Sequence, residues 1–67
     1  MKKYGRTNDG RTWGIFKNKN MPGFSVIYGR TVFDMLDKVA NEAPEKVSTE
    51  IYPTYEMAYS QMRRKFN

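Results

Sequence analysis

The 67-residue chain contains neither cysteine nor histidine. These absences exclude disulfide bonds, thiol nucleophiles, imidazole bases and the usual zinc and iron–sulfur sites. A chain this short forms one domain that buries only about 60 % of the surface its unfolded form exposes, which leaves little room for an enclosed active site. We therefore predict a protein that binds a partner at its surface, not an enzyme, and that holds no metal or other cofactor.

Long hydrophobic runs are also missing. The sequence has no stretch of roughly 18 apolar residues, the length that would span a membrane. Met1-Lys2-Lys3 is followed by Tyr4 and Gly5, not by the apolar segment of a signal peptide. We expect no membrane contact and a cytoplasmic location.

Basic residues are abundant and unevenly placed. The net charge is +5, from 12 basic and seven acidic residues. Residues 1–30 carry seven basic residues against one acidic residue, a net +6, whereas residues 31–62 carry two against six, a net -4, and residues 63–65 add +3. A strongly basic N-terminal half indicates an anionic partner, although small proteins also carry such charge for solubility alone.

The N-terminal part of the chain suggests an arm followed by a hairpin. Residues 1–11 predict a basic arm with one short strand near Lys3–Arg6, and residues 12–67 a single α+β domain. The alternation of Trp13 and Ile15 with Gly14 and Phe16 predicts a strand over residues 12–18. Pro22-Gly23 predicts a turn before a second strand, Phe24–Tyr28.

Two helices and a third strand are expected in the remainder. Thr31 and Asp34 resemble a capping box, and Pro44 is expected to end the helix that starts there. The apolar stripe of this helix is predicted to comprise Val32, Leu36, Val39 and Ala43, widened by Phe33 and Ala40.

Alternating residues then predict a strand over Lys46–Tyr52 with Val47, Thr49 and Ile51 on its buried face. A last helix is predicted after the N-cap Thr54, with the apolar stripe Tyr55, Ala58, Tyr59, Met62 and Phe66. The predicted fold is a two-layer α+β domain of β-β-α-β-α order. Both helices lie on one face of a three-stranded sheet, and the third strand lies beside residues 12–18.

The triplet Gly-Arg-Thr occurs three times, at residues 5–7, 10–12 and 29–31. Glycine lets backbone approach a ligand, arginine grips phosphate and threonine adds a hydrogen bond. The alternative is that each triplet only starts or ends an element. None has phosphate-loop spacing.

The ten aromatic residues are too many for one small core, and with both helices on one face a hairpin face stays uncovered. Exposed aromatics on a basic sheet are typical of modules that stack bases of single-stranded nucleic acid. The alternatives are that the arm or a second subunit, in a homodimer, covers these rings. The predicted nucleic-acid-binding residues are Arg6, Arg11, Trp13, Phe16, Lys17, Lys19 and Arg30.

Nucleic acid, single-stranded or hybrid, is thus the first predicted partner. The alternative is a protein-interaction or host-modulating protein of the phage type that uses a sheet edge or its polarised charge. The expected order of elements over residues 12–66 resembles that of the small hybrid-binding domain found at the start of some RNase H enzymes. This resemblance is one of topology and assigns no individual residue a role.

Overall fold

The computed structural model of the protein describes residues 2–48 and 50–66. Four strands form one antiparallel sheet in the order β1-β2-β3-β4, comprising β1 (Tyr4–Arg6), β2 (Thr12–Lys17), β3 (Phe24–Gly29) and β4 (Glu50–Tyr52). Three helices complete the chain, namely α1 (Val32–Asn41), α2 (Pro44–Val47) and α3 (Tyr55–Phe66). The predicted α+β class is confirmed. The predicted β-β-α-β-α order is wrong, because the elements follow in the order β-β-β-α-α-β-α, with four strands where three were expected.

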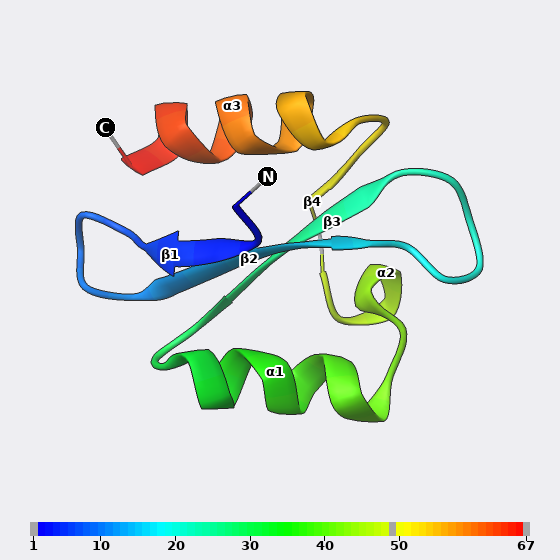
Figure 1. Cartoon of the computed structure of the whole chain (residues 1–67), viewed down its shortest axis with the longest axis horizontal. Coiled ribbons are helices and arrows are strands. Elements are labelled where there is room, and N and C mark those ends of the chain that lie inside the picture. Colours follow the sequence, from blue (N-terminus) through cyan, green and yellow to red (C-terminus); the bar gives the residue numbers. More distant parts are fainter. Residues whose placement is uncertain (1, 49, 67) are drawn as a thin grey trace.

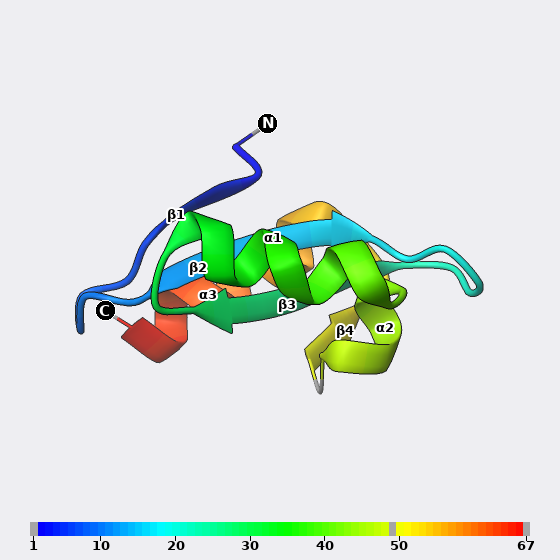
Figure 2. The same ribbon diagram turned by 90° about the horizontal axis from the view of Figure 1, so that it is seen from below.

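The two longer helices, α1 and α3, lie on opposite faces of the sheet, so the prediction that both helices cover one face is wrong. Figure 1 shows α3 on one side of the strands and α1 on the other, and Figure 2 shows α1 in front with α3 behind. Adjacent residues of β2 account for this, because successive strand residues face opposite ways. Trp13 packs against Tyr59 of α3, whereas Gly14 lies against Met35 of α1.

The predicted hairpin is confirmed, and its loop is held by side-chain hydrogen bonds. β2 and β3 pair from Thr12↔Gly29 to Lys17↔Phe24. The buried Asn18 donates from Nδ2 to the Pro22 carbonyl at 3.2 Å and accepts from Ser25 Oγ at 2.5 Å. Gly23 has a φ of +106°, the left-handed conformation that glycine tolerates.

The N-terminal residues belong to the sheet. β1 pairs with β2, with Gly5 opposite Trp13, and a Cβ on Gly5 would lie 3.0 Å from that indole ring. The turn after β1 closes through a backbone hydrogen bond from Thr7 N to Arg11 O at 2.9 Å. Asn8 donates to the backbone oxygen of Phe66, which joins this turn to the end of α3. Met1, at the start of the predicted arm, lies outside the described residues.

The first helix is capped as predicted but buries different residues. Thr31 Oγ1 accepts from the Asp34 amide at 3.1 Å, as an N-cap does. Met35 is 0 % exposed, whereas Phe33, assigned to the apolar stripe, is 84 % exposed. Leu36 is 38 % exposed. A stripe through Met35 has the same helical spacing as one through Leu36, so the apolar pattern did not distinguish them.

The predicted strand over Lys46–Tyr52 is largely wrong. Pro44 is the first residue of the short helix α2, a position that suits proline because its missing N–H needs no partner. Among the described residues of this range, Glu50–Tyr52 form the strand β4, and Ile51, expected on the buried face, is 38 % exposed. Thr49 and Asn67 lie outside the described residues.

The third predicted strand also has a different neighbour. β4 pairs antiparallel with β3, not with β2, because β1 occupies the outer edge of β2. The prediction assumed that the helix between the hairpin and this strand makes a right-handed crossover. That rule applies to parallel strands and does not govern this antiparallel pair.

The last helix follows the prediction. Thr54 Oγ1 accepts from the Met57 amide at 3.2 Å. Ala58 and Met62 are buried against Trp13, Ile15 and Val26. This cluster is the larger part of the core and fixes α3 over the sheet.

Candidate functional site

The sheet register brings the three Gly-Arg-Thr triplets to one end of the sheet. Arg6 in β1 pairs with Thr12 in β2, and Thr12 in turn pairs with Gly29 in β3. Residues 5–7, 10–12 and 29–31 therefore lie side by side, although they are far apart in the sequence. We call this end of the sheet the triplet end.

The glycines and threonines of the triplets have structural roles. Gly10 has a φ of +87° in the turn, and a Cβ on Gly29 would lie 2.9 Å from the backbone nitrogen of Met35. Thr7 and Thr12 are buried, at 7 % and 3 % exposed, and Thr31 caps α1. The three arginines are all exposed, so the charged side chains that the triplets present to solvent are all cationic.

Arg11 is held more tightly than Arg6 or Arg30. Its Nε lies 3.1 Å from Asp9 Oδ2, and its guanidinium lies 5.3 Å from the centre of the Tyr28 ring and 5.2 Å from that of Phe66. A hydrogen bond from Thr7, together with those from Arg11, holds the pKa of Asp9 below its usual range. Asp9 is thus an anion that orders the turn, and Arg11 joins the turn to α3.

The end of α3 adds further cations to this region. Phe66 packs edge-on against Tyr28 at 5.4 Å, and Lys65 Nζ lies 5.3 Å from the same tyrosine ring. Lys65 also pairs with Glu50 at 3.3 Å. Burial, and then the neighbouring Glu50 carboxylate, raises the pKa of the Tyr28 hydroxyl, which therefore stays protonated at neutral pH.

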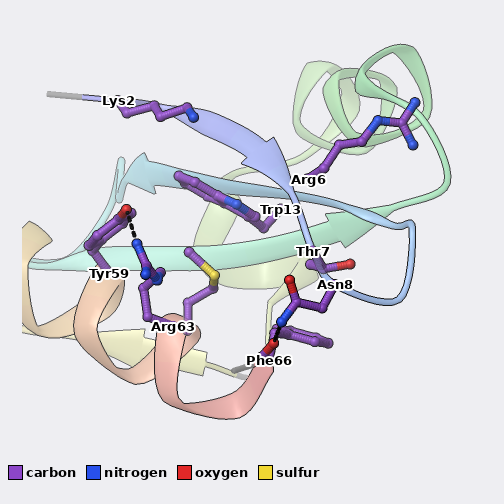
Figure 3. A pocket seen from close by; sticks show the side chains of 9 residues that line it. Lys2, Arg6, Thr7, Asn8, Trp13, Tyr59, Arg63 and Phe66 are labelled. Carbon is purple, nitrogen blue, oxygen red and sulfur yellow. Dashed lines mark hydrogen bonds between the residues drawn. The ribbon is translucent and has the colours of Figure 1, made fainter.

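A cavity of about 210 Å³ lies between β1 and α3, and we call it the β1–α3 cleft (Figure 3). The Arg63 guanidinium lies inside it, with Nη1 donating to the Tyr59 hydroxyl at 3.0 Å. Arg6 lies at its rim and extends away from Arg63, because Gly5 faces α3 and the next strand residue points the other way. The lining residues are Lys2, Arg6, Thr7, Asn8, Trp13, Tyr59, Met62, Arg63 and Phe66.

A second cavity, of about 260 Å³, lies beside the part of β3 that β4 does not cover. Lys38 of α1 reaches across to donate to the Tyr28 carbonyl at 2.8 Å, so a lysine occupies the open edge of the strand. Asp34 supplies the one carboxylate among the lining residues and accepts from the Arg30 backbone N–H at 3.1 Å. These lining residues are Arg11, Tyr28, Gly29, Arg30, Asp34 and Lys38.

Most of these cations have no acidic partner. Among residues 2–48 and 50–66, the ion pairs are Arg11–Asp9 and Lys65–Glu50, and none involves Lys2, Arg6, Arg30 or Arg63. Their charges are therefore available to an external anion.

The structure separates the predicted binding residues into three groups. Arg6, Arg11 and Arg30 meet at the triplet end. Lys17 and Lys19 lie at the opposite end of the hairpin. Lys17 is about 17 Å from Thr12 along β2, because the strand rises by about 3.3 Å per residue. Glu45 holds the loop that contains Lys19. Its carboxylate accepts hydrogen bonds from the backbone amides of Lys19 and Asn20 at 3.1 and 2.8 Å.

The two predicted aromatic residues form the third group, and neither sits on an open face. Trp13 is 4 % exposed under α3, and Phe16 is half-buried near Met35 of α1. The expectation of an uncovered hairpin face fails because the helices divide between the two faces. Arg63 is absent from the predicted binding residues, because the basic residues 63–65 could contact phosphate but also suit the end of their own helix. Its place in the β1–α3 cleft depends on long-range packing.

Among the described residues, no three acidic side chains come together in a way that could hold a metal ion, and no helix has the length and apolar character needed to cross a bilayer.

Comparisons with known proteins found no match among family models, curated proteins or solved structures.

Proposed function

We propose that this protein is a small non-catalytic module that binds nucleic acid through phosphate contacts at the triplet end. The observation that carries the proposal is that Arg6, Arg11 and Arg30, from three separate segments, lie at one end of the sheet, where Arg11 also contacts Phe66 at the end of α3. Arginine presents a planar set of donors that matches phosphate oxygens in pairs.

The charge distribution favours binding of a polymeric anion over binding of a single small anion. The β1–α3 cleft and the cavity beside β3 both contain cations and share this end of the sheet. A ligand with repeated charges can contact both, and every phosphate neutralised releases bound counterions. Contact with about four phosphates of a single strand predicts that log K falls with log salt at a slope of about -3.

The test is a fluorescence anisotropy titration of a labelled oligonucleotide at several salt concentrations. The double variant Arg6→Gln and Arg30→Gln removes two exposed charges from the triplet end. We expect it to weaken binding and to reduce the salt slope by about 1.4, at about 0.7 per phosphate of a single strand.

The matched control is the double variant Lys17→Gln and Lys19→Gln, which removes the same charge from the opposite end of the hairpin. We expect its salt slope to stay close to that of the unaltered protein. An equal loss in both double variants would indicate general attraction between opposite charges, and a salt-independent affinity would remove the proposal.

A protein partner is the second candidate, and one observation favours it. Phe33 is 84 % exposed on α1, and Leu36, one turn further along the same helix, is 38 % exposed. Exposed aromatic side chains of this kind act as anchors in protein interfaces, and a second copy of the chain would be one such partner. A protein captured from nuclease-treated lysate by the unaltered chain, and lost with Phe33→Ser, would support this candidate.

A further inference from the structure

Two tyrosines and an arginine form a row along α3. Tyr55, Tyr59 and Arg63 are spaced by four residues, so they lie one above another on the same side of the helix. The rings of Tyr55 and Tyr59 are nearly parallel, at 11°, with centres 6.0 Å apart. The Arg63 guanidinium lies 5.7 Å from the centre of the Tyr59 ring.

The position of the Tyr59 ring is fixed from two directions. The edge of Trp13 meets it at 5.7 Å and 66° from the buried side. Its hydroxyl accepts a hydrogen bond from Arg63 Nη1 at 3.0 Å. A ring held in this way loses little conformational entropy when a ligand stacks on it, which favours binding.

Two members of the row, Tyr59 and Arg63, border a shallow surface hollow of about 590 Å³. Tyr59, Ser60, Arg63 and Arg64 line this hollow, which we call the α3 hollow. Tyr59 and Arg63 also line the β1–α3 cleft. The α3 hollow and the cleft are therefore neighbours that share a tyrosine and an arginine. A polymer that carries both phosphate groups and aromatic bases could lie across both.

We infer that the α3 hollow stacks an unpaired base on Tyr59 while Arg63 and Arg64 bind the adjacent phosphates, so that the ligand is a single-stranded nucleic acid. This inference rests on the proposed function and specifies its ligand. A duplex keeps its base faces inside the helical stack, whereas a single strand offers them to an aromatic side chain. Trp13, predicted for this role, instead supports the ring that performs it.

The first experiment needs no variant. Anisotropy titrations of the unaltered protein compare a short fluorescent oligothymidylate with an abasic deoxyribose-phosphate oligomer of equal length and with a duplex of equal phosphate number. Stacking of one base predicts that the oligothymidylate binds about tenfold or more tightly than the abasic oligomer. It also predicts that the oligothymidylate binds more tightly than the duplex does.

The second experiment changes the ring. Tyr59→Phe keeps the stacking surface and loses only the hydroxyl that Arg63 contacts, so we expect oligothymidylate binding within about threefold of the unaltered protein. Tyr59→Leu removes the ring, and we expect a loss of about tenfold or more for oligothymidylate, with no change for the abasic oligomer. Circular dichroism checks that both variants fold.

The outcomes separate the inference from the proposed function. Equal affinity for oligothymidylate and the abasic oligomer, or tighter binding to the duplex, overturns the inference and leaves phosphate binding intact. Absence of binding to all three ligands overturns the proposed function itself. If Tyr59→Leu does not fold, the comparison of base-bearing and abasic ligands still tests whether the protein stacks an unpaired base.

Discussion

Substituting Met35 by alanine tests whether α1 packs on its own face of the sheet. Met35 is 0 % exposed, and its sulfur lies so close to β2 that a Cβ on Gly14 would sit 2.4 Å away from it. Met35→Ala removes three heavy atoms, which at about 0.8 kcal/mol each corresponds to about 2.4 kcal/mol of lost burial. The cavity left behind brings the expected loss of stability to about 3 kcal/mol.

This loss is large for a protein of this size. At about 0.05–0.15 kcal/mol per residue, the whole domain is stable by only about 3–10 kcal/mol. Thermal unfolding followed by circular dichroism should therefore show a melting temperature lower by about 12–24 °C in Met35→Ala. The control is Phe33→Ala, a larger truncation at a residue that is 84 % exposed, with an expected change in stability within about 0.5 kcal/mol.

The two variants together decide which face of α1 is buried. A large loss in Phe33→Ala with little effect in Met35→Ala would refute the packing described here and restore the stripe expected from the sequence.

Two further predictions concern the hairpin loop. Gly23→Ala should destabilise the protein by more than about 1 kcal/mol in urea unfolding, because residue 23 has a positive φ and a Cβ there would lie 2.6 Å from the Tyr52 carbonyl oxygen. Gly10→Ala, with a similar φ but open space around the Cβ, should cost less, and an equal cost would contradict the steric part of the argument. Burial of the Glu45 carboxylate tends to raise its pKa, but hydrogen bonds from backbone N–H groups, including those of Asn20 and Lys19, lower it below the ordinary value of 4.5. A lowered pKa means that the ionised form stabilises the fold above about pH 4.5 and that this contribution is lost as the pH falls through the lowered value. The stability difference between the unaltered protein and Glu45→Gln should therefore shrink between pH 7 and pH 3 in urea unfolding, and a constant difference would contradict the assigned role.

Short-range sequence patterns were enough to predict the hairpin and the starts of two helices. The hairpin followed from the alternation around Trp13 and Ile15 and from the turn residues Pro22 and Gly23, and both are short-range features. The helix starts followed from Thr31 and Thr54, whose hydroxyls accept hydrogen bonds from amides three residues ahead.

The division of the helices between two faces depends on contacts between distant residues. The missing side chain of Gly14 in β2 is what admits Met35. A glycine inside a strand is a known sign of close approach by another element, so this signal was present in the sequence. Pro44 was equally ambiguous, because proline both ends one helix and begins another.

The candidate site was predictable in residue type but not in arrangement. Arginines in the repeated triplets were singled out, but only the strand register shows that they share one end of the sheet and that Lys17 and Lys19 do not. Tyr59 and Arg63 are neighbours because they are four residues apart on one helix. The position of this pair beside Trp13 depends on how α3 lies across β2, which no short-range pattern encodes.

The most direct test of the proposed binding surface is a nuclear magnetic resonance titration of the ¹⁵N-labelled protein with a short single-stranded oligonucleotide at low salt. The account predicts that the largest amide shift changes fall at the triplet end and along the last turns of α3, around Arg6, Arg11, Arg30 and Arg63. Changes centred on Lys17–Asn20, or on α1 around Phe33, would contradict it.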